Sequence, residues 1–272
     1  PEPISDWLAQ LRSHWAIREG VAYLNHGSFG PTPLPVQAAR EAFQAELAAE
    51  PMDFFLRQLP ERLEASRKAL ATFVGAEADD LLLVDNATTA MNIVAESVAL
   101  KPGDEVLLND HEYGAVLRIW ERACRSAGAR MVVCPLPALL ESGEQIVDCL
   151  SAAITPRTRL LVVSHITSPT ALILPLKEIV AAAHAKGVPV AVDGPHAVGM
   201  LPLDLKALDA DFYCASCHKW LSAPLGSGFL HVQPRWQSAM QSPLRSWGRP
   251  QPGKAASWRD EFEWLGTRDP AT

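Results

Sequence analysis

Short apolar runs that alternate with stretches of helical periodicity constrain the fold of this chain more than any other feature. The apolar runs predict strands at Leu81–Val84, Glu105–Leu108, Met131–Val133, Leu160–Val163, Pro189–Val192, Phe212–Tyr213 and Gly228–Val232. Between them, helical patterns cover Thr88–Leu100, Ala115–Ala127, Glu144–Ile154 and Leu176–Lys186. Continuous apolar strands are typical of a sheet covered on both faces, and intervening helices imply parallel, right-handed connections. We therefore predict an α/β fold with a mostly parallel, seven-stranded sheet.

The two ends of the chain differ from this central region. Residues 1–75 have mainly helical patterns, with amphipathic stretches at Leu34–Glu50 and Pro60–Val74, and we interpret them as an N-terminal arm and packing helices. Residues 76–272 form the predicted large domain. Its last part, residues 233–272, is rich in Pro, Trp and charged residues and has weak periodicity.

Composition excludes several classes of function. The net charge of −7 argues against nucleic acid as the main partner. No run approaches the roughly 18 apolar residues of a membrane span, and no signal peptide pattern opens the chain. The five scattered cysteines are typical of a reduced, cytoplasmic protein. Cys214 and Cys217 have the spacing of a redox or zinc motif, but no second pair completes a zinc site, so we expect buried thiols and no metal.

One lysine and one acid occupy positions that suggest a covalently held cofactor. Asp193 ends the strand-like run Val190–Asp193, at the place where ligand crevices lie in α/β proteins. Lys219 lies on the C-terminal side of the next apolar run and is followed by Trp220. This combination suits a cofactor with a charged ring nitrogen. The competing interpretations are a turn or helix-capping aspartate and a solvated surface lysine.

The motifs around these two residues resemble a known family. Asp193-x-x-His196, Ser216-x-His218-Lys219 and the opening run Tyr23–Pro33 are similar to the class V aminotransferases, fold type I enzymes that use pyridoxal 5′-phosphate (PLP). The opening run favours the isopenicillin N epimerase-like and cysteine desulfurase-like branch. The resemblance implies a three-layer PLP-binding large domain, a homodimer and an amino acid substrate. It also implies that the family's smaller C-terminal domain is absent from these 272 residues.

The resemblance implies a role for individual residues. Lys219 forms the Schiff base with PLP, Asp193 pairs with the pyridine nitrogen, and His196 contacts the ring hydroxyl. These three are the expected catalytic residues. The expected phosphate ligands are Ala87, Thr88, Thr89, Ser216, His218 and, from the neighbouring subunit, Thr267. For the turn that contains Thr88 and Thr89, a plain helix cap is the alternative interpretation.

The remaining expected contacts concern the ring face and the substrate. Tyr113 is favoured over His111 for stacking on the ring, because the following helix then starts in register. Thr167 is a second residue that approaches the ring. Asn25, His26 and Gly27 resemble a substrate-facing loop, although Gly27 alone also suits a simple turn.

The predicted function is PLP-dependent chemistry at the Cα of an amino acid, of the epimerase or aminotransferase type. A C–S lyase or cysteine desulfurase is the first alternative, and a truncated PLP-binding fragment without turnover is the second. A nicotinamide-binding domain is excluded, since no Gly-x-Gly-x-x-Gly follows a strand.

Overall fold

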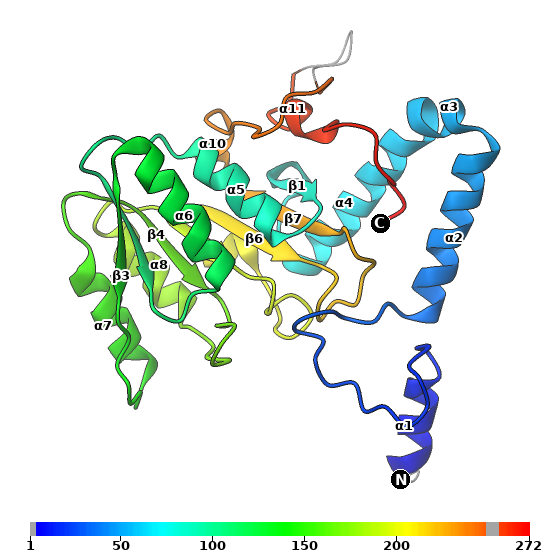
Figure 1. Ribbon diagram of the computed structural model, residues 1–272, viewed down its shortest axis with the longest axis horizontal. Coiled ribbons are helices and arrows are strands. Elements are labelled where there is room, and N and C mark those ends of the chain that lie inside the picture. The colour runs from blue at the N-terminus through cyan, green and yellow to red at the C-terminus, as the bar shows by residue number, and fades with distance from the viewer. Residues whose placement is uncertain (1–3, 249–255) are drawn as a thin grey trace.

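The computed structural model describes residues 4–248 and 256–272. Its centre is one seven-stranded sheet with the strand order β1-β7-β6-β5-β4-β2-β3 (Figure 1). The strands are β1 Leu81–Val84, β2 Glu105–Asn109, β3 Arg130–Cys134, β4 Thr158–Ser164, β5 Val190–Asp193, β6 Phe212–Ser216 and β7 Gly228–Val232. β7 runs antiparallel to its neighbours β6 and β1, and the other neighbouring pairs are parallel. The predicted seven-stranded, mostly parallel sheet is confirmed.

Helices cover both faces of the sheet and give it three layers. α5 (Ala87–Ser97) and α6 (Gly114–Ala127) cover one face and lie in front of the sheet in Figure 1. α4 (Leu59–Val74), α7 (Gly143–Ala153), α8 (Leu176–His184) and α9 (Leu205–Leu208) contribute buried residues to the core on the other face. Neighbouring residues of one strand, such as Leu81 and Leu82, enter different cores. This burial on both faces is the reason why the strands read as continuous apolar runs.

The structure extends most predicted strands by one or more residues. β2 and β4 continue one polar residue past the predicted ends, to Asn109 and Ser164, and β6 continues past Tyr213 to Ser216. β5 ends at Asp193, the acid that closes the run Val190–Asp193. All four polar residues are buried, so the neighbouring strands still pair with them. The polar strand ends therefore lie inside the molecule and not in solvent-exposed turns.

The N-terminal region is helical, as its pattern predicts. It contains α1 (Ile4–Arg12), α2 (Leu34–Ala49), α3 (Pro51–Asp53) and a π-helical turn (Phe54–Gln58) before α4. α2 buries no residue and stands apart from the sheet (Figure 1). α4, in contrast, places Ala71 and Val74 in the core. The division into an arm and a large domain stays a prediction.

The C-terminal region is irregular apart from the short helices α10 (Pro234–Gln237) and α11 (Asp260–Glu263). It is nevertheless attached to the core, because Phe262 is buried beside the α5 and α6 face. Within the described ranges, no helix combines the length and apolar character that crossing a bilayer requires.

Candidate active site

Four neighbouring strands end in polar residues, and these strand ends lie together on one side of the molecule. Because β2, β4, β5 and β6 are parallel, their carboxyl ends meet there, and Ser164 lies in register with Asp193. A cavity of about 350 Å³ opens at these strand ends. That volume is in the range of small-molecule sites. Its polar lining residues are Ser28, Asn86, Thr88, Tyr113, Ser168, Asp193, His196, Ser216, His218 and Lys219.

Lys219 is held in the cavity by a short chain of polar contacts. Its Nζ lies 3.2 Å from Nε2 of His196, and Trp220 donates its indole N–H to Nδ1 of His196 at 3.3 Å. Because Nδ1 accepts a hydrogen bond, Nε2 is the nitrogen that carries the proton in the neutral imidazole. The His196 N–H therefore points to the lysine nitrogen. Trp220 thus holds the His196 ring in place, a contact that the sequence analysis did not assign.

The cavity favours the uncharged forms of these bases. Burial lowers the pKa of Lys219, and the negative charge of Asp193 offsets part of that effect. Burial, together with Lys219, lowers the pKa of His196 to about 4. The same two causes lower the pKa of His218. A neutral lysine is the nucleophilic form, so the environment of Lys219 suits covalent chemistry at its amine.

Asp193 is a buried acid whose carboxyl has no hydrogen-bond donor among the described residues. Its residue exposure is 5%. Burial raises the pKa of Asp193 to about 7, although Lys219 opposes that shift. A buried carboxyl without a donor fits a ligand that brings a protonated ring nitrogen to it. This observation supports PLP as the group that the site accommodates.

Glu112 is a second buried acid, which the sequence analysis did not single out. Its carboxylate accepts hydrogen bonds from the backbone N–H and hydroxyl of Ser164, both at 2.7 Å, and from the Asn109 amide at 2.6 Å. Burial raises the pKa of Glu112 to about 8, and the charge of Asp193 contributes to the rise. Glu112 thus connects the end of β2 to the end of β4 and lies near enough to Asp193 for their charges to interact. The sequence offered only the position of Glu112 shortly after the apolar run Glu105–Leu108.

The start of α5 provides anion-binding groups. Asn86 caps the helix, since its side chain accepts the Thr89 N–H at 2.9 Å, and this cap explains why α5 begins at Ala87. The Ala87 N–H donates to the Ser216 hydroxyl at 2.9 Å. Nδ1 of His218 is buried and has no hydrogen-bond partner in the described part of the chain. A helix N-terminus beside an unsatisfied imidazole nitrogen fits the phosphate group of PLP.

The geometry distinguishes Tyr113 from His111. Tyr113 lines the cavity, and its ring centroid is 5.9 Å from Nζ of Lys219. His111 contacts the Thr170 hydroxyl through Nδ1 at 2.8 Å and does not line the cavity. Of the two alternatives for ring stacking, Tyr113 is the one that faces the lysine.

The N-terminal loop crosses the site at very close range. The Gly30 N–H donates to the His218 carbonyl at 2.9 Å, and a Cβ on Gly30 would lie 1.9 Å from the Lys219 carbonyl oxygen. Gly27 lines the cavity, and His26 stacks on Trp220 with ring centroids 5.7 Å apart. The loop therefore touches the lysine segment directly, and its expected role toward the substrate stays a prediction. Gly30 was quoted in the opening run without a role.

Five of the expected site residues do not line the cavity: His26, which stacks on Trp220, and Asn25, Thr89, Thr167 and Thr267. Thr89 contacts Asn86, and the Thr167 hydroxyl accepts the Leu172 N–H at 2.8 Å inside its own loop. Asn25 caps a turn by accepting the Ser28 N–H at 3.2 Å. Thr267 is exposed between Gly266 and Arg268. Its expected role is toward a neighbouring subunit and stays a prediction.

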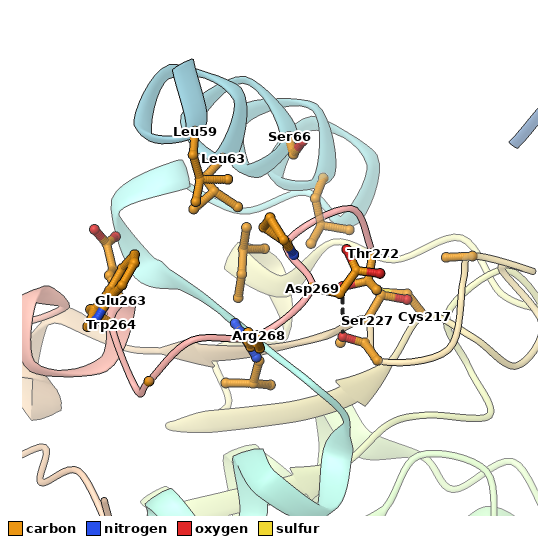
Figure 2. Close-up of a pocket in the computed structure, with 18 of the residues that line it drawn as sticks. Leu59, Leu63, Ser66, Cys217, Ser227, Glu263, Trp264, Arg268, Asp269 and Thr272 are labelled. Atoms are coloured by element: carbon orange, nitrogen blue, oxygen red, sulfur yellow. Dashed lines mark hydrogen bonds between the residues drawn. The ribbon is translucent and has the colours of Figure 1, made fainter. Parts of the chain in front are cut away.

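A second pocket of about 230 Å³ lies next to Thr267 (Figure 2). Figure 2 shows Leu59 and Leu63 projecting from α4 toward the C-terminal segment that carries Trp264 and Arg268. Arg268 forms an ion pair with Asp85, the residue before Asn86. This pocket is largely apolar and does not contain Lys219 or Asp193.

Comparison with known proteins decides the family. Residues 23–251 match the family described as "Aminotransferase class-V". The chain belongs to this family. It is 40% identical over 278 aligned positions to isopenicillin N epimerase of Streptomyces clavuligerus, covering 98% of this chain and 69% of the relative. It is 35% identical to a putative L-cysteine desulfhydrase of Oryza sativa subsp. japonica, covering 96% of this chain and 57% of that protein.

Two solved structures, of C-DES and of the cysteine desulfurase CsdA, have the same fold as this chain. A lysine-to-alanine mutant of C-DES, with glycine covalently linked to its PLP cofactor, superposes with a TM-score of 0.86 at 27% identity. The match covers 93% of this chain and 68% of that protein. The cysteine desulfurase CsdA of Escherichia coli superposes with a TM-score of 0.80 at 28% identity, covering 97% and 68%. The family and fold expected from the motifs are confirmed: the chain is a class V, PLP-type enzyme domain.

Proposed function

We propose that this chain binds PLP through Lys219 and supports reactions at the Cα of an amino acid. The observation that carries the proposal is the convergence of Lys219, His196 and Asp193 in one cavity at the carboxyl ends of parallel strands. The unpartnered carboxyl of Asp193 and the unpartnered nitrogen of His218 fit the ring nitrogen and the phosphate of PLP.

Each group in the cavity has a separate task. When bound, PLP supplies a ring that withdraws electrons from the substrate Cα. Asp193 holds positive charge at the ring nitrogen, and His196 donates its Nε2–H inside the cavity. Ser216, His218 and Thr88 hold the phosphate beside the start of α5. Tyr113 covers one side of the site, and the amine of Lys219 attaches the cofactor and accepts or returns the Cα proton.

The reaction that we favour is epimerisation or a related Cα proton transfer. Epimerisation begins with removal of the Cα proton, and the amine of Lys219, whose pKa is lowered by burial, is the group in the cavity that accepts it. The identity to isopenicillin N epimerases is also the highest among the relatives described above. A C–S lyase is the second candidate, because the cystine C-S lyase C-DES superposes with a TM-score of 0.85.

We expect the 272 residues alone to bind PLP and to turn over little substrate. An amino acid carboxylate is best recognised by a bidentate arginine, and no arginine is among the described residues that line the cavity. The chain aligns with 69% of the isopenicillin N epimerases and 68% of C-DES. We infer that the segment corresponding to the rest of those proteins supplies the carboxylate contact.

The test separates binding from turnover. PLP-loaded protein is reduced with borohydride, digested and mapped, and the cofactor mass is expected on the peptide that contains Lys219. Lys186→Ala is the matched control, since that exposed lysine should leave the map unchanged. Label on another lysine, or none in folded protein that holds PLP, contradicts the assignment.

Turnover is then measured with candidate amino acids in deuterated water. Deuterium at Cα with inversion supports an epimerase, whereas sulfide and a keto acid from cysteine or cystine support a lyase. Rates near the ordinary enzyme range of about 1–1,000 s⁻¹ would contradict the expectation of low turnover.

A further inference from the structure

A pair of cysteines outside the cavity is arranged for a reaction that the proposed PLP chemistry does not use. Cys134 ends the edge strand β3, and Cys149 lies on α7. Their Sγ atoms are 3.1 Å apart, while both residues are free thiols. A disulfide bond is about 2.05 Å long, so the sulfurs need to approach by only about 1 Å. From this geometry we propose that Cys134 and Cys149 are a redox-active dithiol that forms a reversible disulfide within the chain.

The surroundings give the two thiols different roles. Cys149 is half-buried, and its Sγ lies 3.3 Å from the Pro135 carbonyl oxygen. Cys134 is buried, with 7% of its surface exposed. Burial and the neighbouring Cys149 raise the pKa of Cys134 to about 12. Cys149 is therefore the thiol that meets a reagent from solvent, and Cys134 is the thiol that resolves the product.

The oxidant that fits is a small disulfide of the glutathione type. The Cys149 thiolate attacks one sulfur of the reagent and releases one small thiol, leaving a mixed disulfide on Cys149. The Cys134 thiol then gives up its proton, attacks Sγ of Cys149 and releases the second small thiol. The two protein thiols together lose two electrons and two protons, and one reagent disulfide gains them and becomes two thiols.

The other cysteines do not share this arrangement. Cys124, Cys214 and Cys217 are buried, and none has a sulfur–sulfur contact in the described part of the chain. Burial raises the pKa of each. The Cys214-x-x-Cys217 pair, whose spacing is typical of redox motifs, is thus buried and has no sulfur–sulfur contact in the described part of the chain.

The disulfide would close the loop between β3 and α7 beside the active site. The Cys134 carbonyl accepts the Asp110 N–H at 3.2 Å, and the Asp110 carboxylate accepts the Leu136 N–H at 2.9 Å. Asp110 belongs to the segment that leads to Glu112 and Tyr113. Oxidation therefore restrains the loop after Cys134, and this loop is hydrogen-bonded to Asp110 in the segment that contains Tyr113.

The experiment uses the folded, PLP-loaded chain with oxidised glutathione as the probe. Free thiols counted after denaturation are expected to fall from five to three, and dithiothreitol should restore all five. The intact mass should fall by about 2 Da, and peptide mapping should recover Cys134 linked to Cys149. Cys134→Ala should stop at a glutathione adduct on Cys149, and Cys149→Ala should not react. Cys124→Ala serves as the matched control and should still form the link.

Several outcomes would overturn the proposal. These are five unreacted thiols in the parent, a Cys214–Cys217 link, or stable glutathione adducts without a cross-link. Circular dichroism before and after oxidation checks that the reacting protein is folded. A cross-link that forms only in unfolded protein would also overturn it.

Discussion

The crossing of the N-terminal loop over Lys219 gives the sharpest quantitative prediction, the substitution Gly30→Ala. The new Cβ would lie 1.9 Å from the Lys219 carbonyl oxygen and 2.7 Å from that of His218. An ordinary contact begins at 3.4 Å, so the two backbone segments must separate by about 1.5 Å. Backbone atoms of a buried segment cannot rotate away, in contrast to the end of a flexible side chain.

The cost of this separation has two parts. Overpacking that forces a backbone shift costs about 1–3 kcal/mol, and the hydrogen bond from the Gly30 N–H to the His218 carbonyl contributes about 1 kcal/mol. We expect the free energy of unfolding to fall by about 2–4 kcal/mol. The contact of 3.2 Å between Lys219 and His196 is also disturbed, since Lys219 carries the displaced carbonyl. PLP affinity is expected to fall as well, and formation of the Lys219 Schiff base should slow by about 100-fold, because a misplacement of about 1 Å costs about that much in rate.

Substitutions at two other glycines serve as controls for the effects of Gly30→Ala on stability and PLP affinity. A Cβ on Gly114 meets nothing within 4 Å, so Gly114→Ala should leave stability and PLP affinity almost unchanged. A Cβ on Gly27 would lie 3.2 Å from side-chain atoms of His196 and Trp220, which can yield slightly. Gly27→Ala should therefore reduce PLP affinity more than stability. Urea unfolding and PLP titration measure both quantities. If Gly30→Ala unfolds at the same urea concentration as Gly114→Ala, the close crossing of the loop is wrong.

Four further results are expected. Trp220→Phe removes the donor to Nδ1 of His196, and ¹⁵N NMR of the PLP-free protein should show a mixture of His196 tautomers; an unchanged Nε2–H form contradicts the role given to Trp220. For Glu112→Gln, the comparison is with a parent carboxyl whose pKa is raised in the folded state. Ionising the buried Glu112 carboxyl lowers the free energy of unfolding of the parent. This loss is absent below the pKa of the unfolded chain, grows as pH rises and is complete above about pH 8. Because the glutamine side chain of the variant cannot ionise, the free energy of unfolding of Glu112→Gln should rise by a few kcal/mol relative to the parent between pH 5 and pH 8. Equal pH dependence of the two unfolding curves would show that Glu112 is ionised in the folded protein. Asp193→Asn should retain part of its PLP binding and slow Cα proton exchange by several kcal/mol, on the scale of about 3–5 kcal/mol for a broken buried ion pair; exchange at the parent rate contradicts the pairing. Sedimentation of the PLP-loaded chain should give a dimer, whereas a fully loaded monomer would show that Thr267 of a neighbour is not needed.

The parts of the fold that follow local rules could be predicted from the sequence. Strands buried on both faces leave continuous apolar runs, and this pattern located all seven strands. Parallel strands then bring their carboxyl ends together, which is why Asp193 and the segment containing Lys219 meet although 26 positions separate them in the sequence. Some strand ends were predicted too early, because a residue such as Ser164 is polar in the sequence although it is buried in the fold.

The remaining features of the site depend on contacts between distant segments. Gly30 touches Lys219 across nearly 190 positions, and no local pattern encodes that approach. In the sequence Glu112 is an ordinary charged residue of a loop, yet the three hydrogen-bond donors to its carboxylate come from β2 and β4. Thr167 looks like a ring contact in a motif, but its hydroxyl completes its own turn. A motif identifies which residues approach a site, whereas hydrogen-bond competition decides which of them face it.

Burial shifts four titratable groups, three lining the cavity and Glu112 outside its lining, toward their neutral forms, which affects the choice of ligand. Burial raises the pKa of Asp193 and Glu112 and lowers that of Lys219 and His196, so each group is shifted toward its neutral form. A ligand with a single charge would leave most of these groups neutral and desolvated. A ligand that carries a cation at one end and an anion at the other can meet Asp193 and the start of α5 at the same time. We therefore expect the cavity to favour a molecule with charges of opposite sign in fixed positions, and PLP with a protonated ring nitrogen has that character.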